Sequence, residues 1–458
     1  LLYLVSTQNI IYEMKRSMAD SNLAIIMELR MFLENICSDP LSRGKYVCSC
    51  GDFSRKRILC FGTLVLFLLH TVKRSLNVEL NCFFENLYGA GSCSKQAFSK
   101  QRRKLKAVFF HDWNQQLISS FYTHNKGKYA RWKGFRLLAV DGSTVALPDK
   151  QELKDTYGYV VNKTSSQRPM ARICVLYDVL NELAIQGLLH SYYTAERDAF
   201  LPILQQQELT DSLLLFDRGY PSYWFIRQLL DKKTHFVIRA QSNTNKVVEA
   251  FIESTQTDMI AEFHPSYKSI NKMRSLGMEI CHKDSIKVRL VKIVLSTGET
   301  EVLITNLYDS THFPVQALKE VYNFRWPVET YYGYLKEELQ LGSFSGTSPI
   351  CIEQDFAANL FLFNIQSIIE KQCEPTLKAI SRKRKYRYKV NKNISWASLK
   401  YRVVKLFIYN NPAHILRELE KLFCKYIEPV RPQRKYPRAK KTVTSLKHYT
   451  LTNYKRAI

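Results

Sequence analysis

Three acidic residues, Asp141, Asp217 and Glu329, stand where metal-assisted chemistry would need carboxylates. The first two directly follow the apolar runs Phe135–Val140 and Ser212–Phe216, which predicts that each lies at the end of a buried strand. In open sheets with parallel strands, functional groups gather beyond the carboxyl ends of the strands, and carboxylate oxygens suit Mg²⁺ or Mn²⁺. Asp-Gly and Asp-Arg-Gly are also ordinary turn sequences, so the two aspartates alone leave a turn-forming role open.

The third acid belongs to an aromatic-rich stretch with charged residues at helical spacing. At 100° per residue, one narrow stripe of a helix would carry Tyr322, Arg325, Glu329 and Lys336. Pro327 must kink such a helix or occupy its first turn. One explanation of this stripe is a set of salt bridges on an exposed helix. The other is that Glu329 ligates a cation while its cationic neighbours bind an anion.

Together these segments resemble the DDE transposases of the IS-four group of bacterial insertion sequences. The resemblance covers roughly residues 90–350 and rests on Tyr-x2-Arg-x3-Glu-x6-Lys, preceded by Asp-Arg-Gly-Tyr and by Asp-Gly-Ser. The three acids are 76 and 112 residues apart, and the second interval is long enough to hold the β insertion that such enzymes carry.

The resemblance implies an RNase H-like core, a cofactor and a set of DNA contacts. The implied cofactor is Mg²⁺, for which Mn²⁺ substitutes. The implied catalytic residues, which are also the metal ligands, are Asp141, Asp217 and Glu329. The residues implied to contact the DNA backbone near the cut are Tyr322, Arg325 and Lys336.

Predicted strands and helices alternate around the two aspartates, which indicates an α/β fold with a mixed sheet flanked by helices. Further strands are predicted at residues 171–179, 183–192 and 235–240, and helices at 195–207 and 221–230. Two β-branched segments, 286–295 and 301–307, flank a hairpin turn at 296–299 and predict a mostly β insertion.

The first 130 residues are predicted to be helical. A turn at 89–92 followed by a basic helix from Ser94 to Phe110 permits a helix-turn-helix interpretation, although a solvated basic face explains the same pattern. The further predicted DNA contacts are Lys100, Arg102 and Arg103 in this helix, and Arg218 beside the second aspartate.

The net charge of +26 favours a polyanionic partner, nucleic acid before membrane. Residues 381–458 hold 22 basic and 3 acidic residues, so +19 of this charge lies there. The interleaved tyrosines suit phosphate contact, and a solvated tail is the alternative. The longest apolar run, residues 58–69, is too short to span a membrane, and no membrane partner is expected.

The sequence therefore predicts five regions and a transposase. The regions are a helical DNA-binding domain (1–130), the first part of the RNase H-like core (131–241), a β insertion (242–311), the second part of the core with the Glu329 helix (312–375) and a basic helical C-terminal region (376–458). The expected partners are double-stranded DNA and a second copy of the chain, in the cytoplasm of a bacterium near the nucleoid. Two alternatives are a transposase-derived DNA-binding protein and an RNase H-like nuclease without strand transfer.

Overall fold

The structure is a computed structural model. It describes residues 2–431 apart from a few short segments, and side chains from residue 18 onward. The segments not described are 56, 71–74, 90, 162–165, 295–298, 335–341 and 401, together with the side chain of residue 88.

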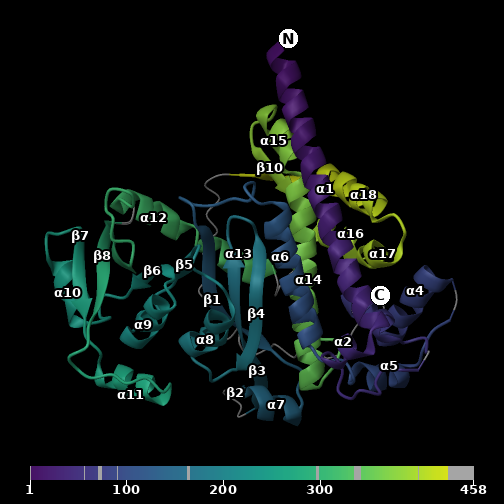
Figure 1. Cartoon of the computed structure of the whole chain (residues 1–458), viewed down its shortest axis with the longest axis horizontal. Coiled ribbons are helices and arrows are strands. Elements are labelled where there is room, and N and C mark those ends of the chain that lie inside the picture. The colour runs from purple at the N-terminus through teal and green to yellow at the C-terminus, as the bar shows by residue number, and fades with distance from the viewer. Residues whose placement is uncertain are drawn as a thin grey trace.

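A mixed sheet forms the centre of the molecule (Figure 1). Its core strands are β1 (Arg136–Ala146), β3 (Gln167–Asp178), β4 (Leu183–Ser191), β5 (Ser212–Phe216) and β6 (His235–Ala240). They lie in the order β4-β3-β1-β5-β6, with β1, β3 and β4 antiparallel to one another in turn and β5 and β6 parallel to β1. This is the strand order of an RNase H-like fold, and it confirms the predicted mixed sheet flanked by helices.

The segment after β6 extends this same sheet. It contains α10 (Lys246–Glu253), β7 (Asp258–Phe263), α11 (Tyr267–Ser275), β8 (Ile286–Val294) and β9 (Thr300–Thr305). Strand β9 pairs antiparallel with β6, then with β8, which pairs with β7. Strands β8 and β9 were predicted, whereas β7 and the two helices were not. Most of the predicted hairpin turn, residues 296–298, lies outside the described residues.

Helices cover both faces of the sheet because the side chains of β1 alternate between two apolar layers. Leu137 and Ala139 pack in the layer of α12 (Val315–Asn323) and α13 (Trp326–Gly333). Leu138 packs in the opposite layer, with α8 (Glu196–Gln206) and α9 (Tyr223–Asp231). The helix that carries Glu329 is therefore fixed against one face of the strand that carries Asp141.

Three long helices run side by side next to β4: α1 (Leu2–Ser38), α6 (Val108–His124) and α14 (Pro349–Gln372) (Figure 1). Trp113 of α6 stacks on Phe361 of α14, with ring centroids 4.2 Å apart. The helices near the N-terminus thus share one core with the sheet. The remaining helices there are α2 (Pro40–Gly44), α3 (Phe61–Leu69), α4 (Leu76–Tyr88) and α5 (Lys95–Arg102), and α7 (Gln151–Tyr157) precedes the short edge strand β2 (Tyr159–Val161).

The basic C-terminal segment is folded as far as the structure describes it. It forms α15 (Glu374–Arg382), α16 (Lys392–Lys400), α17 (Val403–Ile408), α18 (Pro412–Lys425) and a two-stranded ribbon of β10 (Arg387–Val390) and β11 (Ile427–Val430). Leu399, Leu406 and Phe423 are buried in the main core. The solvated-tail alternative is therefore wrong for residues 381–431. In the described part of the chain, no helix is both long and apolar enough to cross a bilayer.

Candidate active site

The two aspartates lie level with each other on neighbouring parallel strands. Ala139 of β1 pairs with Leu215 of β5, so two residues further on Asp141 is level with Asp217. Asp217 follows the end of β5, as predicted, but the prediction that β1 ends before Asp141 is wrong. The strand continues because β3 remains its antiparallel partner, with Asp141 opposite Val175.

Glu329 lies in the first turn of α13, which begins at Trp326 and has Pro327 as its second residue. Tyr332 holds this helix on β1, because its buried hydroxyl donates a hydrogen bond to the backbone carbonyl of Asp141 at 2.7 Å. Pro327 thus occupies a first helical turn, one of the two placements expected for it, and the stripe is divided between two helices. Tyr322 lies near the end of α12, and Arg325 lies in the break before α13.

Two adjacent tyrosines test whether the hydrogen bond from Tyr332 to the Asp141 carbonyl contributes to stability and cleavage. Tyr332→Phe should lower the free energy of unfolding by about 1 kcal/mol, because it removes the hydrogen bond to the Asp141 backbone. It should also reduce cleavage several-fold. Tyr331 is the matched control: its ring stacks on Tyr177, but its buried hydroxyl has no partner within the described residues. Tyr331→Phe should therefore be neutral or stabilising. Denaturant unfolding and a cleavage assay measure both variants. Equal losses of stability and cleavage in the two would contradict a role of the Tyr332 hydroxyl in holding α13 on β1.

The guanidinium of Arg325 stands among the three acids. Its side chain is only 4% exposed, and Nη2 donates to Oε1 of Glu329 at 2.6 Å. Burial opposes the charged form, but Tyr322, Glu329 and Asp217 together raise the pKa of Arg325. Its Nε and Nη1 are buried without a hydrogen-bond partner in the described part of the chain. Two of its nitrogens are therefore free to donate to an anionic ligand.

Burial raises the pKa of Asp141 to about 7. Arg325 and the Gly142 N–H, which donates to Oδ1 at 2.9 Å, work against this shift, whereas the charges of Glu196 and Glu329 add to it. A partly buried carboxylate with two acidic neighbours is poorly compensated, and a cation at this place would stabilise its charged form.

Asp217 is more firmly paired. Its Oδ1 lies 3.1 Å from Nε of Arg239 and 3.5 Å from the hydroxyl of Tyr322. Arg239 also binds Glu301 of β9 at 2.6 Å, so the insertion helps to position this aspartate. Arg239 and Glu301 were missed from the sequence, because no local pattern links β6 and β9 to residue 217.

Glu196 is a further acid that the sequence did not assign to the site. It begins α8, and its side chain lies against Gly142 and Gly219, where an added Cβ would come within 2.8 Å and 3.0 Å of it. Its Oε1 also accepts a hydrogen bond from Arg172 of β3 at 3.2 Å. The Glu196-Arg197 pair is a further point at which the sequence resembles the IS-four transposases, and that resemblance was the available signal.

The residue types fit a divalent cation. Carboxylate oxygens are the ligands that Mg²⁺ and Mn²⁺ prefer, and the aspartates lie on adjacent strands. Within the described residues, however, no three acidic, histidine or cysteine side chains form a metal-binding cluster as they stand. Glu329 is bound to Arg325 instead. Coordination by all three acids therefore requires this ion pair to open.

The other predicted DNA contacts differ in their surroundings. Lys100, Arg103 and Arg218 are exposed, and Lys336 lies outside the described residues. The prediction that Arg102 is an exposed contact is wrong, since it is 2% exposed and binds Asp355 at 2.7 Å. Its other partners are Gln354, Ser345 and the carbonyl of Cys351.

Arg102 is therefore expected to stabilise the fold. Arg102→Ala should lower the free energy of unfolding by about 3–5 kcal/mol, because it leaves buried polar partners uncompensated. Arg103→Ala, at an exposed neighbouring position, should change it by less than about 0.5 kcal/mol. Urea unfolding measures both, and an equally stable Arg102→Ala variant would contradict this role.

Comparisons with known proteins agree with this geometry. A family model described as the transposase DDE domain matches residues 132–365, just over half of the chain. The transposase InsG for insertion sequence element IS4 of Escherichia coli (strain K12) is 22% identical over 247 residues, covering 53% of this chain and 54% of that protein. The putative transposase y4zB of Sinorhizobium fredii (strain NBRC 101917 / NGR234) is 29% identical over 147 residues, covering 31% and 39%.

The chain thus spans about half or less of the length of these curated relatives. Among solved structures, the piggyBac transposase synaptic complex with hairpin DNA is similar at a TM-score of 0.41 and 12% identity, covering 92% of this chain and 88% of that one.

Proposed function

The chain belongs to the family of transposases with a DDE domain, and on this basis we propose that it catalyses cut-and-paste DNA transposition. It would bind the ends of an insertion sequence, cleave the DNA there and join the ends to a target. The observation that carries this proposal is that Arg325 binds Glu329 at 2.6 Å and interacts electrostatically with Asp141 and Asp217, which lie level with each other at one edge of the sheet.

The proposed ligands of the metal are these three acids. Held by them, Mg²⁺ or Mn²⁺ would activate a water molecule, or the 3′-hydroxyl of a cleaved DNA strand, as the nucleophile and would neutralise charge on the attacking and leaving oxygens. The assignment is supported by the types of these side chains and by their places: Asp141 lies in β1, Asp217 follows the neighbouring strand β5, and Glu329 lies on the helix packed against β1. No protein nucleophile is needed for this chemistry.

Arg325 has two proposed functions. In the free protein it compensates the charge of Glu329 through their ion pair. In the DNA complex its planar fork would donate to phosphate oxygens near the cut, which releases Glu329 toward the metal. Its two unpaired buried nitrogens support this exchange of partners. Tyr322, which lies beside Asp217, would orient that carboxylate or donate to the phosphate.

The exposed cations Lys100, Arg103 and Arg218 are proposed to bind DNA phosphates further from the cut. A homodimer is proposed for the complex, since two ends must be held together for joining. The alternative of a DNA-binding protein that no longer cuts is less well supported, because all three acids are present.

The test is to incubate the purified protein with Mg²⁺ and the DNA that flanks its gene, and to map cuts and joined products at nucleotide resolution. Metal-dependent cuts at two defined ends, with joined products, would support the proposal. Nicking without joining would favour the nuclease alternative. Binding without cutting would favour the DNA-binding alternative.

A further inference from the structure

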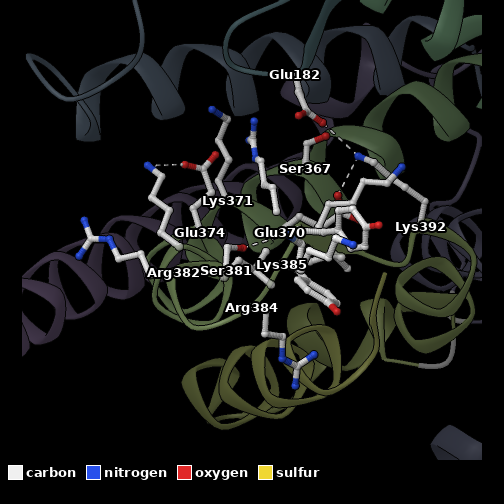
Figure 2. Close-up of a pocket in the computed structure, with 17 residues that line it drawn as sticks. Glu182, Ser367, Glu370, Lys371, Glu374, Ser381, Arg382, Arg384, Lys385 and Lys392 are labelled. Atoms are coloured by element: carbon white, nitrogen blue, oxygen red, sulfur yellow. Dashed lines mark hydrogen bonds and ion pairs between the residues drawn. The ribbon is translucent and has the colours of Figure 1, made fainter. Parts of the chain in front are cut away.

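A basic cavity of about 470 Å³ lies between α14, α15 and the β10 ribbon (Figure 2). Its lining combines eight basic residues with three acidic ones. The basic residues are Lys371, Lys378, Arg382, Arg384, Lys385, Arg387, Lys389 and Lys392, and the acidic ones are Glu182, Glu370 and Glu374. The surplus of positive charge suits an anionic ligand.

One group of these cations is engaged in the fold. Lys392 binds Glu370 at 2.7 Å and Glu182 at 3.1 Å, and these acids raise its pKa although burial opposes the charged form. Lys389 binds Glu428 on the partner strand of the ribbon at 3.0 Å. Such pairs fix the position of the ribbon, and their charges are already compensated.

A second group remains uncompensated. We call it the basic rim; it consists of Arg382, Arg384, Lys385 and Arg387. All four are exposed, and none has a carboxylate partner in the described part of the chain. Figure 2 shows Arg382 and Arg384 extending away from the cavity, whereas Lys392 points toward Glu182.

Aromatic rings hold two of the rim cations in place. The guanidinium of Arg384 lies 4.8 Å from the ring centroid of Tyr388, and the ammonium of Lys385 lies 5.6 Å from that of Tyr386. These cation–π contacts restrict side chains that would otherwise move freely, which lowers the entropy lost when they bind a ligand.

The cavity adjoins the helix of the candidate active site. A second cavity of about 830 Å³ shares Glu182, Lys389 and Lys392 with it. Its lining also includes Trp326 and Thr330 of α13, the helix that carries Glu329. Shared lining residues thus connect the basic cavity to the helix that carries Glu329.

We propose that the basic rim binds the phosphate backbone of duplex DNA whose cleavage site lies at the three acids. This inference rests on the proposed function and assigns part of the DNA path. Four exposed cations without carboxylate partners, two of them held by aromatic rings, match a regularly charged polymer. Contacts to phosphate carry no sequence preference. An anionic membrane surface would also attract lysine and arginine, but it would not extend to a partly buried acidic site.

The test compares two variants of the full chain that lose the same charge. The rim variant is R382Q/R384Q/K385Q/R387Q, and the control variant is K126Q/K150Q/K232Q/K283Q, which changes four exposed lysines in other parts of the fold. Affinity for a mixed-sequence DNA duplex is measured over a range of salt concentrations, and affinity for phosphatidylserine vesicles is measured in parallel.

The rim variant should reduce the slope of log affinity against log salt by up to about 3.6, or about 0.9 for each lost contact, and the control variant should change it much less. Equal slopes for the two variants would overturn the proposal, as would a loss confined to the vesicles. If the parent protein failed to bind any duplex, the proposed function itself would be wrong.

Discussion

Asp141→Asn is expected to reduce metal-dependent DNA cleavage by ~10³-fold or more, which corresponds to about 4 kcal/mol of transition-state stabilisation. The replacement keeps the shape of the side chain but removes a proposed metal ligand. Binding of DNA should be nearly unchanged, because the proposed phosphate contacts lie on other residues. Single-turnover cleavage and duplex binding of parent and variant measure the two effects separately.

Asp141→Asn should also change how the stability of the protein depends on pH, and this effect can be measured without an activity assay. Because the pKa of Asp141 is raised to about 7 in the folded protein, this carboxyl binds a proton there at pH values where the unfolded chain has released it. Without metal, this group makes the parent less stable as pH rises from about 4 toward 7, and the loss is complete above that range. Asp141→Asn removes the effect, so its advantage over the parent should grow across this window.

Adding Mn²⁺ at neutral pH should stabilise the parent more than Asp141→Asn, because a ligand that binds the folded state raises its stability. Asp217→Asn, which changes the residue that follows the neighbouring strand β5, should reduce cleavage to a similar extent. Substantial metal-dependent cutting by either variant would remove that residue from the proposed site.

Arg325→Ala should produce the second largest effect, a loss of cleavage of roughly 10²–10³-fold. The change removes a bidentate donor to phosphate and the counter-charge of three acids. Arg325→Lys should recover only part of the activity, since an ammonium keeps the charge but cannot reproduce the planar fork. Metal affinity should not fall with cleavage, because loss of the ion pair leaves Glu329 free to coordinate.

Cleavage of both variants is therefore followed across a Mn²⁺ titration, together with binding to DNA ends. High Mn²⁺ should not restore Arg325→Ala if phosphate is its partner. If Arg325→Ala bound and cut DNA like the parent, its pair with Glu329 would be only a structural salt bridge.

Much of the core could be predicted because its signals are local. The strand that ends at Phe216 is a short apolar run closed by a turn, and Asp217 follows it as predicted. Asp141 also follows a short apolar run and begins a turn-like sequence. Strand β1 nevertheless continues past it, because β3, which comes later in the chain, supplies hydrogen bonds to it. A turn-like dipeptide does not end a strand that still has a partner.

The predictions that failed depend on tertiary contacts. Arg102 looked like one more cation on a basic helix, but Asp355 and its neighbours in α14 enclose it. Nothing in the spacing placed Glu196 against Gly142, or Arg239 beside Asp217. Side chains brought together by sheet pairing and helix packing leave no periodic trace in the sequence.

The most direct measurement is an anomalous-scattering map from crystals of the protein grown with Mn²⁺ and a DNA duplex that contains the cut site. Manganese should lie about 2.1 Å from carboxylate oxygens of Asp141 and Asp217, with Glu329 released from Arg325 to coordinate it and Arg325 donating to a phosphate. Manganese bound only elsewhere, with the Arg325–Glu329 pair intact beside bound DNA, would contradict the proposal that these three acids form the catalytic centre.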